Sequence, residues 1–447
     1  MELSAFPRFF TSVFDRFSML ALFFMVFALV FDFMKRRKGQ NYPPGPWGLP
    51  FIGNIFQVNW NSPHLSFAKL WKEYGDVVSV QFGWTNTVIL NGYKTLKEAL
   101  VKKSEDFADR PQFAVYDEIV KMIGEGIVFA RYGPWWREQR RFSLSTLRNL
   151  GLGKRSLEAR ILEEAKFLNK QFENAKGLPF DPHISLNNAT SNIICSIIFG
   201  ERFDYQDEKF HKFLHYLSED LALEGGFWGQ MKHDPKTSFL KSNLLGTAID
   251  LFAAGTESTS TTLRWGLLFM VLHPDVQSKV QEEIDSVIGK ERKPALDDRE
   301  EMPYTNAVIH EIQRAGNITP ISVPHQTYRD TEVMGYTIPK GTMIIPNLSS
   351  ALFDENVWST PHQFNPGHFL NSAGGFVKPE AFIPFSAGRR VCLGEQLAKT
   401  ELFLFFTSML QQFTFHLPEN EPRPNYTESK FGITLSPRPY RLCVKLR

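Results

Sequence analysis

The stretch that decides the fold is FIPFSAGRRVCLGEQLAKTE, residues 382–401, which contains one of only three cysteines in the 447-residue chain. Cys392 stands between Arg390 and Gly394, and Gly388 lies two residues before that arginine. Glycines permit tight or left-handed backbone and allow another group to approach closely. The helix that we expect from Glu395 onward would favour a thiolate at its start. Cys392 is therefore a candidate metal ligand or nucleophile, and a structural loop cysteine is the alternative.

The rest of the composition is that of a globular protein with a large core. The chain is 43% hydrophobic and 22% charged, has 41 phenylalanines, and carries a net charge of +2, which gives no sign of a nucleic-acid partner. An odd, small number of cysteines argues against a disulfide scaffold and for a reducing compartment. Cys195 and Cys443 lie in apolar segments, so we expect both to be buried.

The N-terminus carries an apolar run. Residues 17–34 contain only Ser18 and Asp32 as polar side chains, and KRRK follows at 35–38. A spanning helix needs about 20 residues, and basic flanks stay on the cytoplasmic side. The sequence thus predicts an anchor with its basic flank at 1–40, a proline-rich connector at 41–50, and one cytoplasmic body at 51–447. A buried core helix or a cleaved signal peptide are the alternatives.

Periodicity makes the body mainly α, with a smaller β portion. Apolar residues recur at helical spacing in 156–175 and 273–289, and LFLFF, 402–406, is apolar on every side, as in a buried helix. Two strand pairs are predicted, in 77–90 with a turn near Thr85 and Asn86, and in 335–346 with a turn at 339–341.

The decisive stretch resembles a known signature. Phe385, Gly388, Arg390, Cys392 and Gly394 stand at the spacing F-x-x-G-x-R-x-C-x-G, which is similar to the haem-binding signature of the cytochrome P-450 monooxygenases. The resemblance implies the cytochrome P-450 fold and haem b as the cofactor. It also implies that Cys392 is the proximal ligand of the haem iron and that Arg390 pairs with a haem propionate. A thiolate ligand favours cleavage of the O–O bond.

A second motif lies in AIDLFAAGTESTSTTLRWGLL, 248–268, where we expect a long helix. Small residues here could simply allow close helix packing. In the family, the segment that matches Ala254, Gly255, Glu257 and Ser258 crosses the distal face of the haem. The resemblance makes Glu257 and Ser258 an acid and a hydroxyl for proton delivery. The chain departs from the family in having serine at 258, where threonine is usual.

Further residues acquire roles only through the resemblance. Trp136 and Arg140, at i and i+4, together with Arg110 and His325, match propionate-binding positions; as bare residues, the charged ones would more often be surface charges. Arg137 and Arg141 would add a basic rim suited to an acidic redox partner.

Three other residues match a structural cluster of the family. Glu311 and Arg314 at i and i+3 would ordinarily be an exposed ion pair of small energy. In the family such a pair packs behind the haem, and His368 stands where a later residue completes the cluster. We expect the three to lock the loop that holds Cys392.

Segments along the whole chain resemble microsomal family-2 enzymes, most of all subfamily J; they include NYPPGPW, WREQRRFSLSTLRN and MPYTNAVIHEIQR. Members of that subfamily oxidise polyunsaturated fatty acids, arachidonic acid above all, to epoxides and hydroxylated products, and also oxidise some drugs. One difference is large: the chain is too short between Phe203 and Ala253 for the helices that the family fits there. Much of the substrate roof would be absent around 220–245. Pocket residues carry over only at 110–128, on the helix of Ala254, at 318–323 and at 431–435.

The sequence thus favours a haem-thiolate monooxygenase anchored in the endoplasmic reticulum membrane, with a small apolar substrate. Electrons would come from NADPH through a flavoprotein reductase, with cytochrome b5 as a further partner. One alternative is an impaired or inactive shortened form that acts as a membrane-bound interaction protein. Another is an enzyme that rearranges peroxides without a reductase, against which the Glu257–Ser258 pair argues.

Overall fold

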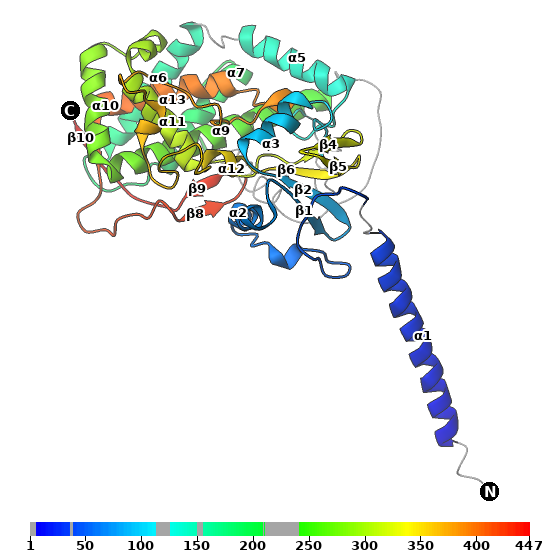
Figure 1. Ribbon diagram of the computed structural model, residues 1–447. Helices are drawn as coiled ribbons and strands as arrows, with labels where there is room; N and C mark the ends of the chain where they lie inside the picture. Colours follow the sequence, from blue (N-terminus) through cyan, green and yellow to red (C-terminus); the bar gives the residue numbers. More distant parts are fainter. Residues whose placement is uncertain (1–5, 36–38, 113–125, 150–154, 209, 211–240) are drawn as a thin grey trace.

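A helical body and a smaller β portion make up the fold, and one helix projects from it (Figure 1). The computed structural model describes residues 6–35, 39–112, 126–149, 155–208, 210 and 241–447. Residues 211–240, which hold nearly all of the segment predicted to begin the substrate roof and most of the stretch where the chain is short, lie outside the described residues. The mainly α prediction, with a smaller β part, is confirmed.

The helices fall where the apolar periodicity places them. The predicted helices at 156–175, 273–289 and 248–268 are observed as α6, α10 and part of α9. The helices of the body are α2 (Pro63–Tyr74), α3 (Tyr93–Lys97), α5 (Pro134–Asn149), α6 (Arg155–Asn174), α7 (His183–Ile198), α9 (Lys241–Leu272), α10 (Pro274–Val287), α11 (Pro303–Gly316), α12 (Leu348–Leu352) and α13 (Glu395–Gln412). Short helical turns are η1 (Ile55–Gln57), η2 (Glu98–Lys102), η3 (Leu296–Glu301), η4 (Pro366–Phe369) and η5 (Gly388–Arg390).

In the part of the chain that the structure describes, four small sheets form the β portion. The strands are β1 (Val77–Phe82), β2 (Thr85–Leu90), β3 (His325–Gln326), β4 (Thr331–Val333), β5 (Tyr336–Ile338), β6 (Met343–Pro346), β7 (Phe413–His416), β8 (Ser429–Phe431), β9 (Leu435–Pro437) and β10 (Cys443–Leu446). The largest sheet has the order β1-β2-β6-β3, and the pairs β4-β5, β8-β9 and β7-β10 stand separately.

Two details of the predicted strands are wrong. The β1–β2 hairpin exists, but its turn is at Gly83 and Trp84 rather than at 85–86, because Gly83 adopts a positive φ of 60°. The segment 335–346 is not a hairpin: β5 pairs with β4, whereas β6 runs parallel to β2. Every residue of β6 is buried, as expected of a central strand, whereas β5 is partly exposed.

Helix α9 runs through the core of the helical body. It packs against α7, α11 and α13, and its C-terminal half is buried from Thr259 to Leu272. The predicted burial of 402–406 on α13 is confirmed, and Phe403, Phe405 and Phe406 are among the largest fully buried side chains. Cys195 and Cys443 are buried free thiols, as expected.

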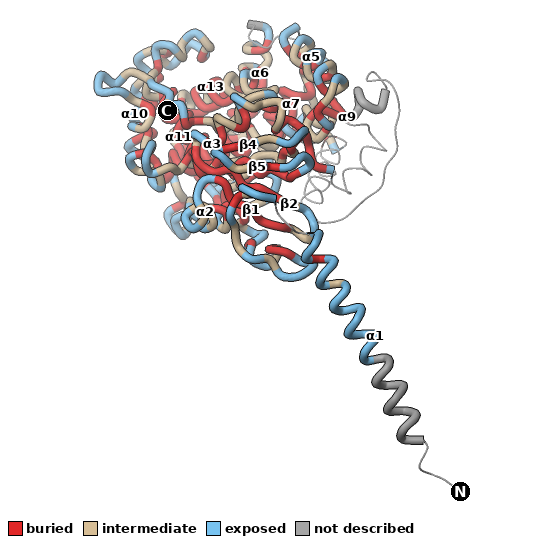
Figure 2. Tube along the Cα trace, turned by 45° about the vertical axis from the view of Figure 1, so that its right-hand side comes forward, coloured by how far each residue is buried: buried red, intermediate tan, exposed pale blue. Residues whose placement is uncertain are grey.

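Helix α1 (Phe6–Lys35) projects away from the body (Figures 1 and 2). Its side chains from Met19 to Met34 are almost all exposed, which does not fit the alternative of a buried core helix. Among the described residues, it is the one helix long and apolar enough to cross a membrane, over Ser18–Lys35.

Candidate active site

The segment around Cys392 is a tight loop that leads into α13. The backbone N–H of Cys392 donates to the carbonyl of Phe385 at 3.0 Å, and α13 begins three residues after Cys392. Gly388 has a φ of 75°, and a Cβ there would lie 1.6 Å from the carbonyl oxygen of Leu100. Only glycine fits this position, so the predicted role of Gly388 in close backbone approach has a physical basis.

The thiol of Cys392 is both accessible and deep in the protein. Its side chain is exposed, yet desolvation by the surrounding protein raises the pKa of the thiol, and a backbone hydrogen bond from Gly394 lowers it only in part. The expected net lowering of the thiol pKa at a helix start is therefore wrong for the free protein, because burial outweighs the backbone contribution.

Buried cationic and indole groups surround the loop that precedes Cys392. Arg390 donates to the carbonyls of Ala108, Ile127 and Ala130 at 2.6–3.2 Å. Trp136, on α5, also donates to the Ile127 carbonyl, at 3.1 Å.

The other predicted propionate donors lie against the same region. Arg140 donates to the carbonyl of Val391 at 2.5 Å, and Arg110 donates to the carbonyls of Val128, Val323 and Pro324. His325 is buried, and its Nδ1 lies 2.6 Å from the carbonyl of Phe107. The five predicted residues thus all bond to backbone carbonyls of the segments 107–108, 127–130, 323–324 and 391, and Trp136 and Arg390 share the carbonyl of Ile127.

The electrostatics of this cluster favour an anion. Burial, with smaller contributions from the charges of Arg110 and Arg140 and against that of Asp109, lowers the pKa of Arg390 to about 8. Burial also lowers the pKa of Arg140 and, together with Arg110, holds the pKa of His325 well below its usual value. Among the described residues, no ion pair involves Arg390 or Arg140.

These residues fit a haem. Its two carboxylates would supply a counter-charge for Arg390 and Arg140. In the part of the chain that the structure describes, no cluster of three or more His, Cys, Asp or Glu could hold a bare metal ion. A single accessible cysteine therefore fits an iron whose other ligands come from a porphyrin.

Helix α9 supplies the predicted distal residues. Ala254 is exposed in the middle of this otherwise largely buried helix. Ser258 Oγ donates to the carbonyl of Ala254 at 2.6 Å. The carboxylate of Glu257 accepts from Thr261 Oγ1 at 3.1 Å and from Thr434 Oγ1 at 2.8 Å. Glu257 and Ser258 therefore lie side by side without a direct hydrogen bond.

Gly255 has a packing role. A Cβ at this position would lie 2.5 Å from the side chain of Ile194 on α7. Close helix packing, the alternative to a functional role, is thus sufficient to account for Gly255.

Sequence reasoning missed Asp250, which lies one turn before Ala254. Its carboxylate accepts from the backbone N–H groups of Ile127 and Val128 at 2.5 and 2.9 Å. Burial raises its pKa to about 6, against those two hydrogen bonds. Since the carbonyl of Ile127 receives Arg390 and Trp136, Asp250 connects α9 to the cation cluster. The sequence did contain a signal for Asp250, because it is an acidic residue within an otherwise apolar part of the predicted helix.

The segments predicted to line a substrate pocket lie next to one another. Leu435 donates to the carbonyl of Ile318 at 2.7 Å, which joins 431–435 to 318–323. Thr434 joins the first of these to Glu257 on α9, and Arg110 reaches Val323. Residues 113–125 of the predicted 110–128 segment lie outside the described residues.

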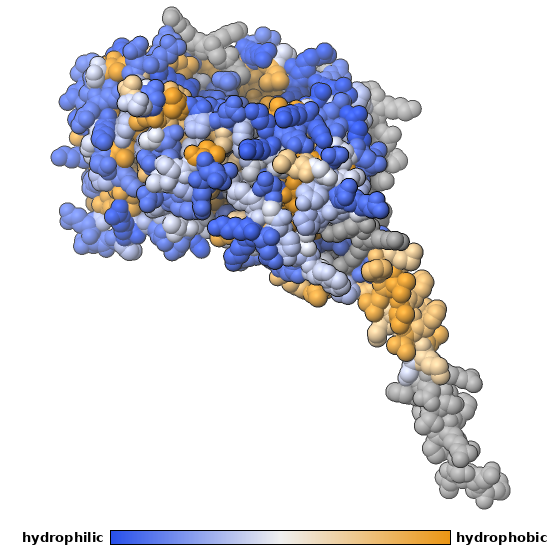
Figure 3. Space-filling view, in the orientation of Figure 1, coloured by the Kyte–Doolittle hydropathy of each residue, from blue (hydrophilic) through white to orange (hydrophobic). Residues whose placement is uncertain are grey.

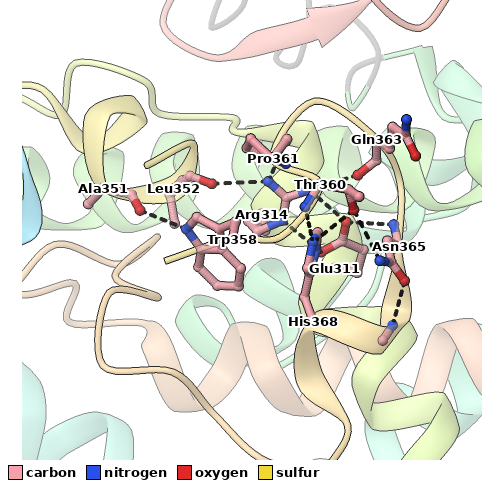
Figure 4. Close-up of polar contacts among 11 residues, drawn as sticks. Glu311, Arg314, Ala351, Leu352, Trp358, Thr360, Pro361, Gln363, Asn365 and His368 are labelled. Carbon is pink, nitrogen blue, oxygen red and sulfur yellow. Dashed lines mark hydrogen bonds and ion pairs between the residues drawn. The ribbon is translucent and has the colours of Figure 1, made fainter. Parts of the chain in front are cut away.

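Glu311, Arg314 and His368 form a second buried cluster (Figure 4). Arg314 makes two 2.7 Å bonds to Glu311 and donates to the carbonyls of Leu352, Pro361 and Gln363. His368 Nδ1 lies 3.2 Å from the Glu311 carboxylate. The pair is fully buried rather than an exposed ion pair.

This cluster reaches the Cys392 segment only indirectly. Its partners all lie between 352 and 368, so it fixes that segment of chain rather than the cysteine loop itself. Phe369, one residue after His368, packs on Phe382, the first residue of the decisive stretch, with ring centroids 4.9 Å apart.

The fold and the cysteine-centred site are those of a haem-thiolate oxygenase. A sequence profile of the family Cytochrome P450 matches residues 43–233 and 219–444. The chain belongs to the cytochrome P450 family, whose members are haem-thiolate monooxygenases that receive electrons from a reductase.

Several relatives are similar over nearly their whole length. Cytochrome P450 2D20 of Mesocricetus auratus is 45% identical over 95% of this chain and 97% of its own. Cytochrome P450 2D6 of Homo sapiens is 46% identical over 95% and 98%, and Cytochrome P450 2J2 of Homo sapiens is 45% identical over 94% and 94%. The family-2 prediction fits these values, but subfamily J is not favoured over subfamily D.

The comparisons also bear on the predicted shortening. The three alignments span 488, 491 and 479 positions, more than the 447 residues of the chain, so each contains positions that this chain lacks. The two profile matches overlap at 219–233, where one match ends and the other begins. Both facts are consistent with a missing block between Phe203 and Ala253, whose location stays a prediction.

Proposed function

We propose that this chain is a monooxygenase of the endoplasmic reticulum membrane that acts on polyunsaturated fatty acids, with Cys392 as the iron ligand. The observation that carries the proposal is the accessible but deeply placed thiol, two residues from a buried arginine that has no carboxylate partner among the described residues. Haem, when bound, supplies dioxygen activation for insertion of one oxygen atom into a C–H or C=C bond.

The protein's own residues would hold and orient the cofactor. Arg110, Arg140, Arg390, Trp136 and His325 would turn toward the propionates, since each donor group already lies at the cluster. The backbone of the cysteine loop would lie against the porphyrin, because the Phe385 carbonyl and Gly388 hold the loop tight. Gly394 would direct its backbone N–H to the thiolate. Ala254 would leave space above the haem plane on α9.

Proton delivery would fall to Glu257 and Ser258. The Ser258 hydroxyl is held at the Ala254 carbonyl, at the accessible part of α9. The Glu257 carboxylate is oriented by Thr261 and Thr434. Because the two groups do not touch, a proton would have to pass between them through a water molecule.

The substrate class is the finer part of the proposal. The resemblance to subfamily J supports fatty acids such as arachidonic acid, and some drugs would be further substrates. Ile433 and Ala254 are both exposed apolar residues of the predicted pocket segments, and an apolar substrate would contact them. The test is to incubate the protein with arachidonic acid. Epoxide and hydroxylated products that form only when reductase and NADPH are both present would identify the activity.

Location and partners follow from two surfaces. Helix α1 would anchor the chain, with the body in the cytoplasm. A pocket of about 350 Å³ is lined by Trp136 together with arginines from α5 and η5, namely Arg137, Arg140, Arg141, Arg148 and Arg389. This basic surface suits an acidic flavoprotein reductase, and cytochrome b5 as a second donor.

The first test is a difference spectrum of the reduced, carbon-monoxide-bound protein. We expect the red-shifted Soret band of thiolate ligation in the parent and in Cys443→Ser, and its loss in Cys392→Ser. A parent protein that takes up no haem, or shows the band of a neutral proximal ligand, would contradict the proposal. That result would favour the alternative, an inactive shortened form.

A further inference from the structure

Asp32, near the C-terminal end of α1, is the residue that joins the helix to the body. Its carboxylate accepts from the backbone N–H of Phe51 at 3.2 Å and from the indole N–H of Trp84 at 3.0 Å. The side chain of Asp32 is only 4% exposed, whereas nearly all of its neighbours on α1 are exposed to solvent. A carboxylate within an apolar helix is costly unless it has partners, and here the body supplies donors.

Aromatic contacts reinforce the junction. Phe31 packs edge-on against Trp84, with ring centroids 6.4 Å apart. The ammonium group of Lys35 lies 4.4 Å from the centre of a Trp84 ring, within range of a cation–π interaction. Three residues within about one turn of α1, Phe31, Asp32 and Lys35, therefore contact the same indole at the β1–β2 turn.

This junction fixes the depth of Trp84 if α1 spans the bilayer. Asp32 precedes Lys35 by three residues, which is about 4.5 Å along a helix axis. Basic flanking residues lie at the level of the lipid headgroups. Trp84 must therefore lie at the headgroup boundary or slightly deeper, which is where tryptophan side chains are enriched in membrane proteins.

Further exposed aromatic side chains lie beside Trp84. The backbone N–H of Gly83 donates to the carbonyl of Ile52, and the rings of Trp60 and Phe82 are 5.2 Å apart. The large exposed residues of this region, which we call the aromatic surface, are Trp47, Leu49, Phe51, Ile52, Phe56, Trp60 and Trp84. Figure 3 shows apolar colouring at the base of the body, next to α1.

The segment that carries most of the aromatic surface lacks charged residues. The sequence has no Asp, Glu, Lys or Arg between Lys38 and Lys69. Trp47 is 94% exposed and Phe56 is 77% exposed. A patch of this kind on a protein surface marks an interaction site, and its continuity with α1 through Asp32 selects lipid as the occupant.

We propose that Asp32 is a latch that holds the β1–β2 turn against α1 and thereby sets the aromatic surface into the lipid headgroup region. The body would then rest on the membrane through two linked contacts, the helix and this surface. The inference rests on the proposed membrane anchorage of α1.

The test uses the full chain in vesicles of phosphatidylcholine that carries bromine on carbons 6 and 7 of one acyl chain, which quenches nearby indoles. The chain has nine tryptophans, so each variant is compared with the parent for the fraction of fluorescence lost. We expect Trp84→Phe to reduce the quenched fraction. We expect Asp32→Ala to reduce it as well, although Trp84 is still present.

Two controls separate the latch from general effects. Trp71→Phe removes a similar indole–aspartate bond, that of Trp71 to Asp76 at 2.8 Å, and should not lower the quenched fraction. Asp32→Asn keeps an oxygen acceptor and should retain the parent value. Equal quenching in the parent, Trp84→Phe and Asp32→Ala would overturn the latch.

Extraction at alkaline pH distinguishes this inference from the proposed anchorage. If carbonate releases the chain from vesicles, the anchorage itself fails. If the chain stays in the membrane but Trp84 is not quenched, the anchor stands and the latch is wrong. Unquenched Trp84 together with a dimer on sedimentation would assign the aromatic surface to a second copy of the chain.

Discussion

Two buried arginines in this protein, Arg314 and Arg390, have different electrostatic surroundings. Each donates to three backbone carbonyls. Arg314 also has a carboxylate, that of Glu311, in a fully buried pair that His368 completes (Figure 4). Arg390 has no carboxylate partner in the described part of the chain, and burial lowers its pKa to about 8.

The difference separates a structural site from a binding site. The protein itself balances the charge of Arg314, so that cluster is complete in the free chain. The charge of Arg390 is solvated by three backbone carbonyls and by the face of Trp136, 4.0 Å away, and Asp109 acts on it without an ion pair. A buried charge without a paired counter-charge is unfavourable. An external anion, such as a haem propionate, would complete the second site.

The largest effect is expected when the complete cluster is broken. Arg314→Met would leave the buried carboxylate of Glu311 without its counter-charge, at a cost of about 3–5 kcal/mol. We expect little folded protein in expression and a sharply lower thermal midpoint. The double variant Arg314→Met, Glu311→Gln should recover part of the loss. Equal midpoints for the single variant and the parent would remove the distinction between the two arginines.

A smaller effect, on the cofactor rather than on the fold, is expected at the second arginine. Arg390→Gln should leave the apoprotein near its parent stability, because it removes an unbalanced charge. Loss of one charge-assisted bond, worth about 1.5–3 kcal/mol, should speed haem transfer to apomyoglobin by about tenfold to a hundredfold. Arg389→Gln, at the exposed neighbour, is the control. Unchanged transfer in Arg390→Gln would contradict the assignment.

Short motifs in the sequence predicted several features of the fold and of these two sites. The spacing around Cys392 and the helical periodicity of 156–175 and 273–289 depend on neighbours in the chain, so they could be read directly. The burial of Glu311 and Arg314 could not, since an i, i+3 pair looks the same on an exposed helix. Only the family resemblance favoured the buried arrangement.

Contacts between distant segments were beyond local reasoning. Strand β6 pairs with β2, and Thr434 bonds to Glu257, 177 residues away. Asp250 accepts a hydrogen bond from the backbone N–H of Ile127, which is 123 residues away in the sequence. No local preference specifies such a partner, because it is set by how whole helices and strands pack.

Asp250 provides a pH-dependent test of the connection between α9 and the cation cluster. Burial raises its pKa from 3.8 to about 6. Between these values the unfolded chain releases the proton while the native state keeps it, so this group lowers stability as pH rises. The loss is about 3 kcal/mol at most, and it is complete above pH 6.

The measurement compares thermal midpoints of the parent and Asp250→Asn from pH 4 to pH 7. We expect the parent's midpoint to fall relative to that of the variant up to about pH 6, and the two curves to run parallel above it. Groups present in both proteins cancel, including His310, whose pKa burial lowers to about 3. A difference that is constant across the whole range would contradict the burial of an ionisable Asp250.

The smallest expected effect concerns Ser258, which stands where the family usually has threonine. Its hydroxyl donates to the Ala254 carbonyl at 2.6 Å, a bond that threonine can also make. The β-branch of threonine restricts χ1 and would hold the hydroxyl more firmly. A gain of about 0.5 kcal/mol from this restriction corresponds to about a twofold change in the population of the hydrogen-bonded rotamer.

We therefore expect Ser258→Thr to release about half as much hydrogen peroxide per NADPH as the parent, in the presence of reductase and substrate. Ser258→Ala, which removes the hydroxyl, should release more than the parent. Haem content and the carbon monoxide spectrum should be the same in all three proteins, because Ser258 lies on α9 and outside the cation cluster. Equal peroxide release in the three would show that the hydroxyl takes no part in proton delivery, and Glu257 would then have to act without it.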